Sequence, residues 1–277
     1  MHSGDMKQRH STMPQESPVL SPEQTVYLDV MDVLTAAGIP FLVGGGFALT
    51  SYTGMARATK DLDLFVLPED FSRIMEVCSA AGYQTKVRFT HWLGKVSKDD
   101  CFVDIIFASG NGLCVVDEEW FQHAVPGKVF NRPVMLCPPE ETIWSKAFIM
   151  ERDRFDGADI AHIFNAKGKE LDWARLLRRF HPHWRVLFSH LILCGYIYPS
   201  DRSKIPDWLI KEFVRRIEIE MNNAPSPERV CQGTLLSWSQ YLHDVEERDY
   251  QDARHFPRGK LTEEQTATLT DTFREGQ

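Results

Sequence analysis

Aliphatic residues occupy every second position between Asp61 and Val66, and Asp61 and Asp63 take two of the positions between them. Because successive side chains of a β-strand point to opposite faces, this pattern predicts a strand with one apolar face and two carboxylates on the other. A second apolar run, Cys101–Phe107, is interrupted only by Asp104. An acid in a buried strand is costly unless it is paired or bound to a metal. The chain must therefore form a sheet that covers the apolar face and brings the carboxylates to a cation.

The other strand and helix signals place this sheet in the first half of the chain. The apolar run Phe41–Val43 leads into Gly44, Gly45 and Gly46, which predicts a strand, a tight turn and the start of a helix. After two prolines at positions 138 and 139, apolar residues recur at helical spacing. Helices are expected over residues 21–38, 47–52, 69–81, 140–152, 156–164, 172–180, 184–196 and 206–221.

These patterns predict an α+β fold of two parts. A small mixed β-sheet with flanking helices is expected over residues 21–138, followed by a mainly α-helical domain over residues 139–277. Residues 1–20, rich in Ser, Pro, Gln and His, are expected to be a disordered tail. The region from 225 to the end is less regular, and its sequence indicates no role.

Composition excludes several classes of protein. No apolar run is long enough to span a membrane, and the polar start lacks the apolar core of a secretory signal, so we expect a cytoplasmic protein without a membrane partner. The formal charge of −8 disfavours a sequence-independent grip on nucleic acid. The six cysteines form no CxxC pair, so neither a zinc site nor a disulfide framework is indicated. The basic and aromatic stretch Arg175–Arg185 is either a local anion-binding patch or, more simply, the solvated face of a helix.

The acidic pair has a specific chemical implication. Asp61 and Asp63 project from one strand face into one small volume, where two anions repel each other unless a cation lies between them. Hard divalent ions such as Mg²⁺ are bound by a few carboxylates together with phosphate oxygens, and Asp104 supplies a third carboxylate. An isolated Asp-x-Asp motif is most often an ordinary exposed strand or turn. The Gly44–Gly46 turn adds context, because free backbone N–H groups at a helix N-terminus favour phosphate.

The order of these pieces resembles a known family. Phe41–Leu49, which contains the glycine turn, and Arg57–Leu64, which contains the acidic pair, are similar to the signature of the nucleotidyltransferase (DNA polymerase β-like) superfamily. A third acid on a later strand belongs to the same signature. The form Arg-x-Thr-Lys-Asp-x-Asp more narrowly resembles the minimal nucleotidyltransferases of the AbiEii type of abortive-infection toxin. The resemblance covers residues 24–165.

The helical half extends the resemblance. Lys146 and the segment from Arg152 to Ile160 are similar to the lysine and the Arg-x-x-x-Asp-x-x-Asp pattern that follow the core in AbiEii-like proteins. The chain departs from the family at Phe155, where a lysine is usual. The resemblance implies that Lys146 and Lys60 bind the nucleotide phosphates and that Asp156 orients Lys146. The alternative is that Lys146 and Asp156 are ordinary surface residues of a helix.

The resemblance implies an enzyme that transfers an NMP from an NTP to a hydroxyl acceptor and releases pyrophosphate. Asp61, Asp63 and Asp104 would be catalytic and hold Mg²⁺, with Mn²⁺ as the alternative ion, and the Gly44–Gly46 turn would hold the β- and γ-phosphates. The acceptor, whether a small molecule, a protein or an RNA end, is not specified by the sequence. The alternative is a non-catalytic or toxin-type module of a toxin–antitoxin or abortive-infection system, with an antitoxin partner. Three mutually repelling carboxylates favour the enzyme.

Overall fold

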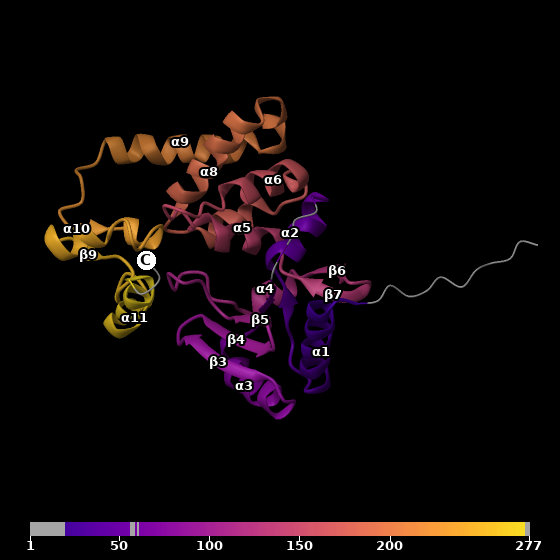
Figure 1. Cartoon of the computed structure of the whole chain (residues 1–277). Coiled ribbons are helices and arrows are strands. Elements are labelled where there is room, and N and C mark those ends of the chain that lie inside the picture. The colour runs from indigo at the N-terminus through magenta and orange to yellow at the C-terminus, as the bar shows by residue number, and fades with distance from the viewer. Residues whose placement is uncertain (1–19, 56–58, 60, 275–277) are drawn as a thin grey trace, which may run out of the picture.

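The structure is a computed structural model that describes residues 20–55, 59 and 61–274, with side chains described to residue 271. It contains a seven-stranded mixed sheet, a second pair of short strands, and helices that flank the sheet and form a further layer above it (Figure 1). This arrangement confirms the predicted α+β fold. The tail at residues 1–19 and Lys60 lie outside the described residues.

The main sheet brings the two acid-bearing strands together. Its strand order is β3-β4-β5-β2-β1-β7-β6, in which β2 is parallel to β5 and antiparallel to β1. In the pairing of β2 with β5, Asp63 lies directly opposite Asp104. The strands are β1 (Leu42–Val43), β2 (Leu62–Phe65), β3 (Gln84–Phe89), β4 (Leu93–Lys98), β5 (Cys101–Ile106), β6 (Val125–Val129) and β7 (Arg132–Leu136).

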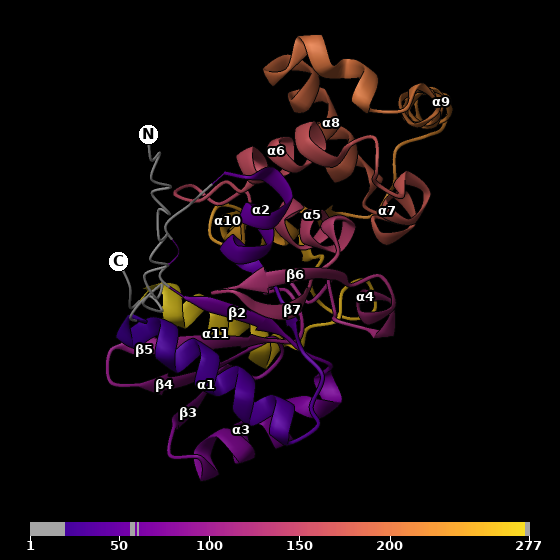
Figure 2. The ribbon, with the colours of Figure 1, turned by 90° about the vertical axis from the view of Figure 1, so that its right-hand side faces the viewer.

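Two helices, α1 (Pro22–Ala36) and α3 (Phe71–Ala80), cover one face of this sheet (Figure 2). Ser21 caps α1 as its sequence predicts, because its hydroxyl accepts a hydrogen bond from the Gln24 backbone N–H while the Gln24 side chain accepts one from the Ser21 N–H. Apolar side chains from alternate positions of β2 and β5 are fully buried beneath the two helices. The carboxylates of the same strands therefore point to the opposite face.

Strands β3 and β4, which form an antiparallel hairpin at one edge of the sheet, are not predicted from the sequence. Most β3 residues are exposed or half-buried, so no apolar alternation marks this strand. In β4, a Cβ atom at Gly94 would lie 2.7 Å from the Phe71 ring of α3, so the ring packs directly on the strand backbone. The hairpin extends the sheet beside β5, on the side away from β2.

The remaining elements up to residue 221 are helical. The helix predicted over 140–152 ends earlier, at Ala147, and the chain then forms a tight hairpin in which Met150 is bridged to Phe155. The helices are α2 (Gly45–Thr53), η1 (Pro68–Asp70), α4 (Glu118–Gln122), α5 (Pro139–Ala147), α6 (Gly157–Lys167), α7 (Trp173–Arg179), α8 (Trp184–Ile197), η2 (Pro199–Lys204) and α9 (Asp207–Met221).

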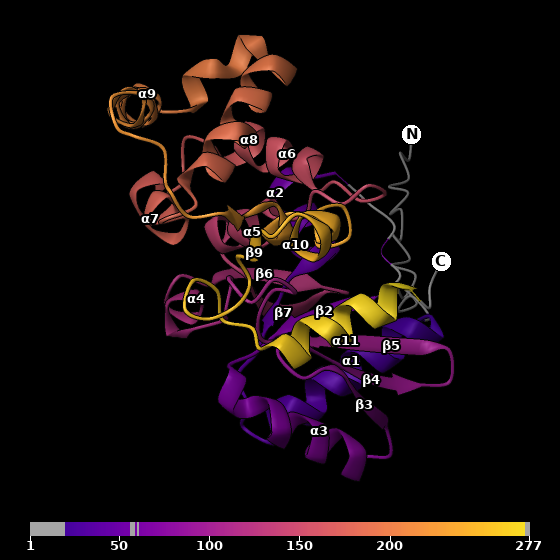
Figure 3. The ribbon, with the colours of Figure 1, turned by 90° about the vertical axis from the view of Figure 1, so that its left-hand side faces the viewer.

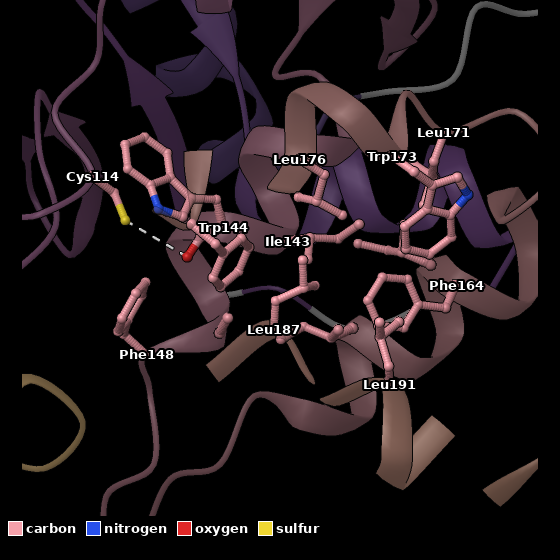
Figure 4. Close-up of a cluster of buried hydrophobic side chains, with 14 of the residues drawn as sticks. Cys114, Ile143, Trp144, Phe148, Phe164, Leu171, Trp173, Leu176, Leu187 and Leu191 are labelled. Carbon is pink, nitrogen blue, oxygen red and sulfur yellow. Dashed lines mark hydrogen bonds between the residues drawn. The ribbon is translucent and has the colours of Figure 1, made fainter. Parts of the chain in front are cut away.

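A second hydrophobic core lies between these helices and the sheet. Figure 4 shows Ile143 of α5, Phe164 of α6 and Leu187 of α8 among its buried side chains. Cys114, from the segment that follows β5, donates its S–H to the backbone oxygen of Trp144 across 3.6 Å. This core therefore joins residues from both halves of the chain.

In the basic stretch Arg175–Arg185, the side chains of Arg175 and Arg179 form neither a solvated helix face nor an open anion-binding site. The Arg175 guanidinium is buried and donates to Glu140 at 2.5 Å and to Glu141 at 2.8 Å. Arg179 donates to Glu141 at 3.1 Å and to Asp117 at 2.6 Å. These ion pairs join α7 to α5 and to the segment before α4. The guanidinium groups of Arg175 and Arg179 therefore connect α7 to its neighbours through ion pairs.

The C-terminal region, which the sequence left without a role, returns to the sheet. Figures 2 and 3 show α1 and α11 on opposite sides of the sheet, and α11 contacts β3. Across residues 20–55 and 61–274, no helix is both long enough and apolar enough to cross a membrane. The elements of this region are β8 (Val230–Cys231), η3 (Gly233–Leu235), α10 (Leu242–Glu247), β9 (Gln251–Asp252) and α11 (Glu263–Arg274).

Candidate active site

Three carboxylates meet on the face of the sheet that α1 and α3 leave open. Asp63 of β2 and Asp104 of β5 are register partners, and Asp61 immediately precedes β2. One oxygen atom from each carboxylate lies within 4.8 Å of the others. The parallel pairing of two short strands is therefore sufficient to gather acids that are far apart in the sequence.

The surroundings of Asp63 disfavour its charge. Burial, followed by the nearby charges of Asp61 and Asp104, raises the pKa of Asp63 to about 7, although Lys146 and Arg154 act in the opposite direction. Burial also raises the pKa of Asp104, which Lys95 partly offsets across a distance of 2.8 Å. The cluster therefore carries more negative charge than its protein neighbours neutralise.

The glycine turn packs directly on this cluster. The Gly44 N–H donates to the Asp63 backbone oxygen at 3.0 Å. Gly45 has a φ of +53°, and a Cβ atom there would lie 1.7 Å from Asp63 Oδ2. At Gly46, a Cβ atom would approach the Thr59 side chain to 3.0 Å. The start of α2 and the carboxylates thus share one small volume, which only glycine at position 45 permits.

Lys146 is held by acids of the following helix rather than left free. Its Nζ lies 2.7 Å from Asp156 and 2.9 Å from Asp159. Asp156 also accepts two hydrogen bonds from Arg154, each 3.2 Å long. Burial alone would raise the pKa of Asp156, but the hydrogen bonds from Arg154 and Lys146 hold it below its ordinary value. Lys146 and Arg154 are close enough to Asp63 for their charges to lower its pKa.

Three side chains of this site, Lys95, Asp159 and Arg154, were not predicted from the sequence. Lys95 was missed because β4 was not recognised, and its pairing with Asp104 depends on strand register. Asp159 was not predicted as a site residue, although its spacing of three residues from Asp156 on a helix is a signal that the sequence contains. Arg154 was quoted only as part of a motif. Lys60 cannot be placed, because it lies outside the described residues.

Comparison with known proteins identifies the family. A family described as an uncharacterised nucleotidyltransferase matches residues 25–194, which is more than half of the chain. The chain belongs to this nucleotidyltransferase family. The matched range of this nucleotidyltransferase contains the glycine turn, the three carboxylates and Lys146. No curated protein matches the chain.

Several solved structures are similar to this nucleotidyltransferase at low sequence identity. The solution structure of the antibiotic-resistance factor ANT(2'')-Ia is 17% identical, with a TM-score of 0.41, over 62% of this chain and 96% of that chain. The lincosamide antibiotic adenylyltransferase LnuA is 14% identical, with a TM-score of 0.38, over 50% and 95%. An antigenic nucleotidyltransferase-like protein from Paracoccidioides brasiliensis is 15% identical, with a TM-score of 0.39, over 66% and 90%. We infer no substrate from these likenesses.

Proposed function

We propose that this protein is a divalent-metal-dependent enzyme that transfers an NMP from an NTP to a hydroxyl acceptor. The oxygen of the acceptor hydroxyl bonds to the α-phosphorus, and the bond from that phosphorus to the oxygen bridging the α- and β-phosphates breaks. Pyrophosphate leaves with the electron pair, and Asp104 takes the hydroxyl proton. The observation that carries the proposal is the meeting of Asp61, Asp63 and Asp104 beside a glycine turn at the start of a helix.

The donor set fits Mg²⁺ or Mn²⁺. Three carboxylates with oxygens within 4.8 Å of one another are hard ligands of the kind these ions prefer. The raised pKa of Asp63 reflects burial beside two like charges, which a divalent cation would relieve. Asp61, Asp63 and Asp104 would hold the ion. When bound, it supplies charge neutralisation at the phosphate oxygens and lowers the pKa of an attacking hydroxyl.

Other side chains have distinct tasks in this proposal. The Gly44–Gly46 turn offers backbone N–H groups at the start of α2 to the phosphates of the NTP. Arg154, whose side chain is 64% exposed, is the more accessible cation of the pair near Asp63. The Lys146 side chain is 16% exposed and is paired with two acids. It can contact a phosphate only if Asp156 and Asp159 leave part of its ammonium group available. Asp156 therefore orients both cations toward the nucleotide.

Calorimetry with each NTP in the presence of Mg²⁺ tests this function, followed by transfer of label from an α-labelled NTP to a mixture of cellular RNA, protein and metabolites. We expect heat with at least one NTP and label in one fraction. Asp61→Asn should lower transfer by at least about 100-fold through loss of a metal ligand. Asp32→Asn, an exposed acid paired with Arg132, serves as the control and should leave transfer unchanged. The absence of heat with every NTP, together with an inert Asp61→Asn substitution, would refute the proposal.

The narrower resemblance to AbiEii-type toxins stays part of the proposal. A gene for an antitoxin beside the gene for this protein, and growth arrest on expression that Asp61→Asn relieves, would support a toxin. Transfer activity without any effect on growth would instead indicate a nucleotidyltransferase that is not a toxin, with a small molecule, a protein or an RNA end as its acceptor.

A further inference from the structure

A row of charged side chains crosses the face of the sheet opposite α1 and α3, on which α11 also packs. Strand register places Lys86 opposite Lys95, Lys95 opposite Asp104, and Asp104 opposite Asp63. Paired positions in neighbouring strands direct their side chains to the same face, so all four share the side that carries the carboxylates. Neighbouring strands are about 4.8 Å apart, which puts Lys95 and Lys86 within one and two strand spacings of Asp104.

The glycine turn and the two lysines lie on opposite sides of the carboxylates. Gly44 follows β1 and bonds to the backbone of Asp63, so the glycine turn lies on the β2 side of the carboxylates. The lysines lie on the other side, beyond Asp104. If the NTP phosphates occupy the turn, as the proposed function requires, the acceptor hydroxyl approaches from the side of Lys95 and Lys86.

The hairpin that carries these lysines is basic in an acidic chain. Residues 84–98 contain Lys86, Arg88, Lys95 and Lys98 and no acid, whereas the whole chain has a formal charge of −8. Among the described residues, neither Lys86 nor Arg88 has a carboxylate within ion-pair distance, and both side chains are exposed. Helix α11 packs against β3 on this side of the sheet (Figure 3), yet the Lys86 side chain is exposed.

The pairing of Lys86 with Lys95 on neighbouring strands destabilises the folded state through charge repulsion, and the fold alone does not explain this cost. Like charges directly opposite each other on neighbouring strands are destabilising. Lys95 is compensated by Asp104 at 2.8 Å, whereas no acid among the described residues pairs with the exposed Lys86. A metal ion held by Asp104 would compete for the carboxylate oxygens that neutralise Lys95, which would leave two cations facing the acceptor. An anion bound between them would remove the repulsion.

We propose that the acceptor carries a phosphate group next to the hydroxyl that receives the nucleotide, and that Lys86 and Lys95 bind this phosphate. This inference rests on the proposed function and names its substrate class. Both a nucleic-acid strand with a free 3′-hydroxyl and a phosphorylated sugar present this chemistry. Lys86 and Lys95 are thereby specificity-determining residues, because they favour a phosphate-bearing acceptor over an uncharged or cationic one.

Two assays on the full chain test this proposal. The first assay measures, by fluorescence anisotropy at several salt concentrations, how a short fluorescent single-stranded RNA with a free 3′-hydroxyl binds to the protein without NTP. Ribose 5-phosphate is added as a competitor. In the second, label from the NTP that binds is offered to the RNA, to ribose 5-phosphate and to ribose. We expect binding and labelling of at least one phosphate-bearing compound, with no labelling of ribose. The compound that is labelled distinguishes a strand from a sugar phosphate.

The hairpin offers a matched control. Lys98 has the same charge but points to the opposite face, where it lies over the Tyr83 ring. Lys86→Ala should weaken acceptor binding about 5-fold, the effect of about 1 kcal/mol, and reduce the salt slope by about 1 for a single phosphate contact. Its affinity for the NTP should not change. Lys98→Ala should leave acceptor binding and its salt slope as they are in the wild type.

Three results would overturn the inference. They are labelling of ribose as efficiently as ribose 5-phosphate, equal effects of Lys86→Ala and Lys98→Ala, and the absence of binding by both phosphate-bearing probes. Failure of the proposed function looks different. In that case no NTP binds and nothing is labelled, while the anisotropy assay still reports whether Lys86 and Lys95 hold phosphate.

Discussion

At the scale of single residues, Gly45 and Asp63 depend on each other. The positive φ of Gly45 turns the backbone at the start of α2, and the missing Cβ leaves the space that Asp63 Oδ2 occupies. Asp63 in turn is buried beside two further carboxylates and would be stabilised by a cation. A position that looks like an ordinary turn glycine is thereby tied to the candidate metal ligands, which makes both residues good subjects for mutation.

We expect Gly45→Ala to lower the free energy of unfolding by about 1–2 kcal/mol for the left-handed backbone alone, and by more because the new Cβ must displace Asp63. Gly54→Ala is the matched control, since Gly54 has a φ of +69° and no atom within 4 Å of its added Cβ. Urea unfolding measures both. Equal losses of unfolding free energy in the two variants would show that Asp63 moves away from the new Cβ atom without a free-energy cost. Nucleotide transfer should be lost only in Gly45→Ala.

Asp63→Asn should make the metal-free protein more stable at pH 8, by about 1–3 kcal/mol, because it removes a buried negative charge beside Asp61 and Asp104. The same substitution should abolish the rise in thermal unfolding temperature that Mg²⁺ produces in the wild type. Thermal unfolding with and without Mg²⁺ measures both effects. A less stable Asp63→Asn protein would mean that the carboxylate is a structural anchor instead of a metal ligand.

At the scale of elements, helix α8 supports the end of the helix that carries Lys146. His190 of α8 is buried and bonds to the backbone oxygen of Ala147 at 2.9 Å, immediately after Lys146. The ring also stacks on Phe155, which lies between Arg154 and Asp156 in the hairpin after α5. One imidazole therefore contacts both segments that place cations near the carboxylates.

This contact predicts a pH dependence. Burial lowers the pKa of His190 below its ordinary value, so as pH falls below about 6.5 the unfolded chain takes up a proton that the folded protein resists. Stability is then lost on acidification, by at most about 1.4 kcal/mol per pH unit for one proton. His190→Gln retains a donor and cannot titrate. Its free energy of unfolding should fall less steeply than that of the wild type between pH 7 and 5, and parallel curves would contradict the prediction.

At the scale of the whole molecule, the C-terminal region holds the Arg154 hairpin in place. Glu151 accepts hydrogen bonds from the Trp238 N–H at 3.2 Å and from the Ser239 hydroxyl at 3.0 Å, and from the Ser237 hydroxyl. The second core also includes residues from both sides of the prolines at 138 and 139. We retain the division into a core at 21–138 and a helical domain at 139–277 as a proposal about origin and function, because packing continues across it.

Glu151→Ala should release this connection. Hydrogen bonds to a charged group contribute about 1.5–3 kcal/mol each at most, and we expect a total loss of about 2–3 kcal/mol because solvent replaces part of them. Hydrogen exchange should accelerate in residues 150–156 and 236–240 together. The control Glu170→Ala removes an exposed pair with Lys167 and should cost less than about 1 kcal/mol. Faster exchange confined to 236–240 would show that the hairpin holds its shape alone.

The sequence by itself determined the elements whose signals are local. Alternation predicted β2, a continuous apolar run predicted β5, and the serine cap predicted the start of α1. The glycine turn with three acids predicted the candidate site. Only the tertiary structure decided the partners of these residues. Lys95 reaches Asp104, Arg154 lies near Asp63, and Arg175 is buried because strand register and helix packing join distant segments. Local periodicity specifies which face of an element is apolar, but it carries no information about which element will cover that face.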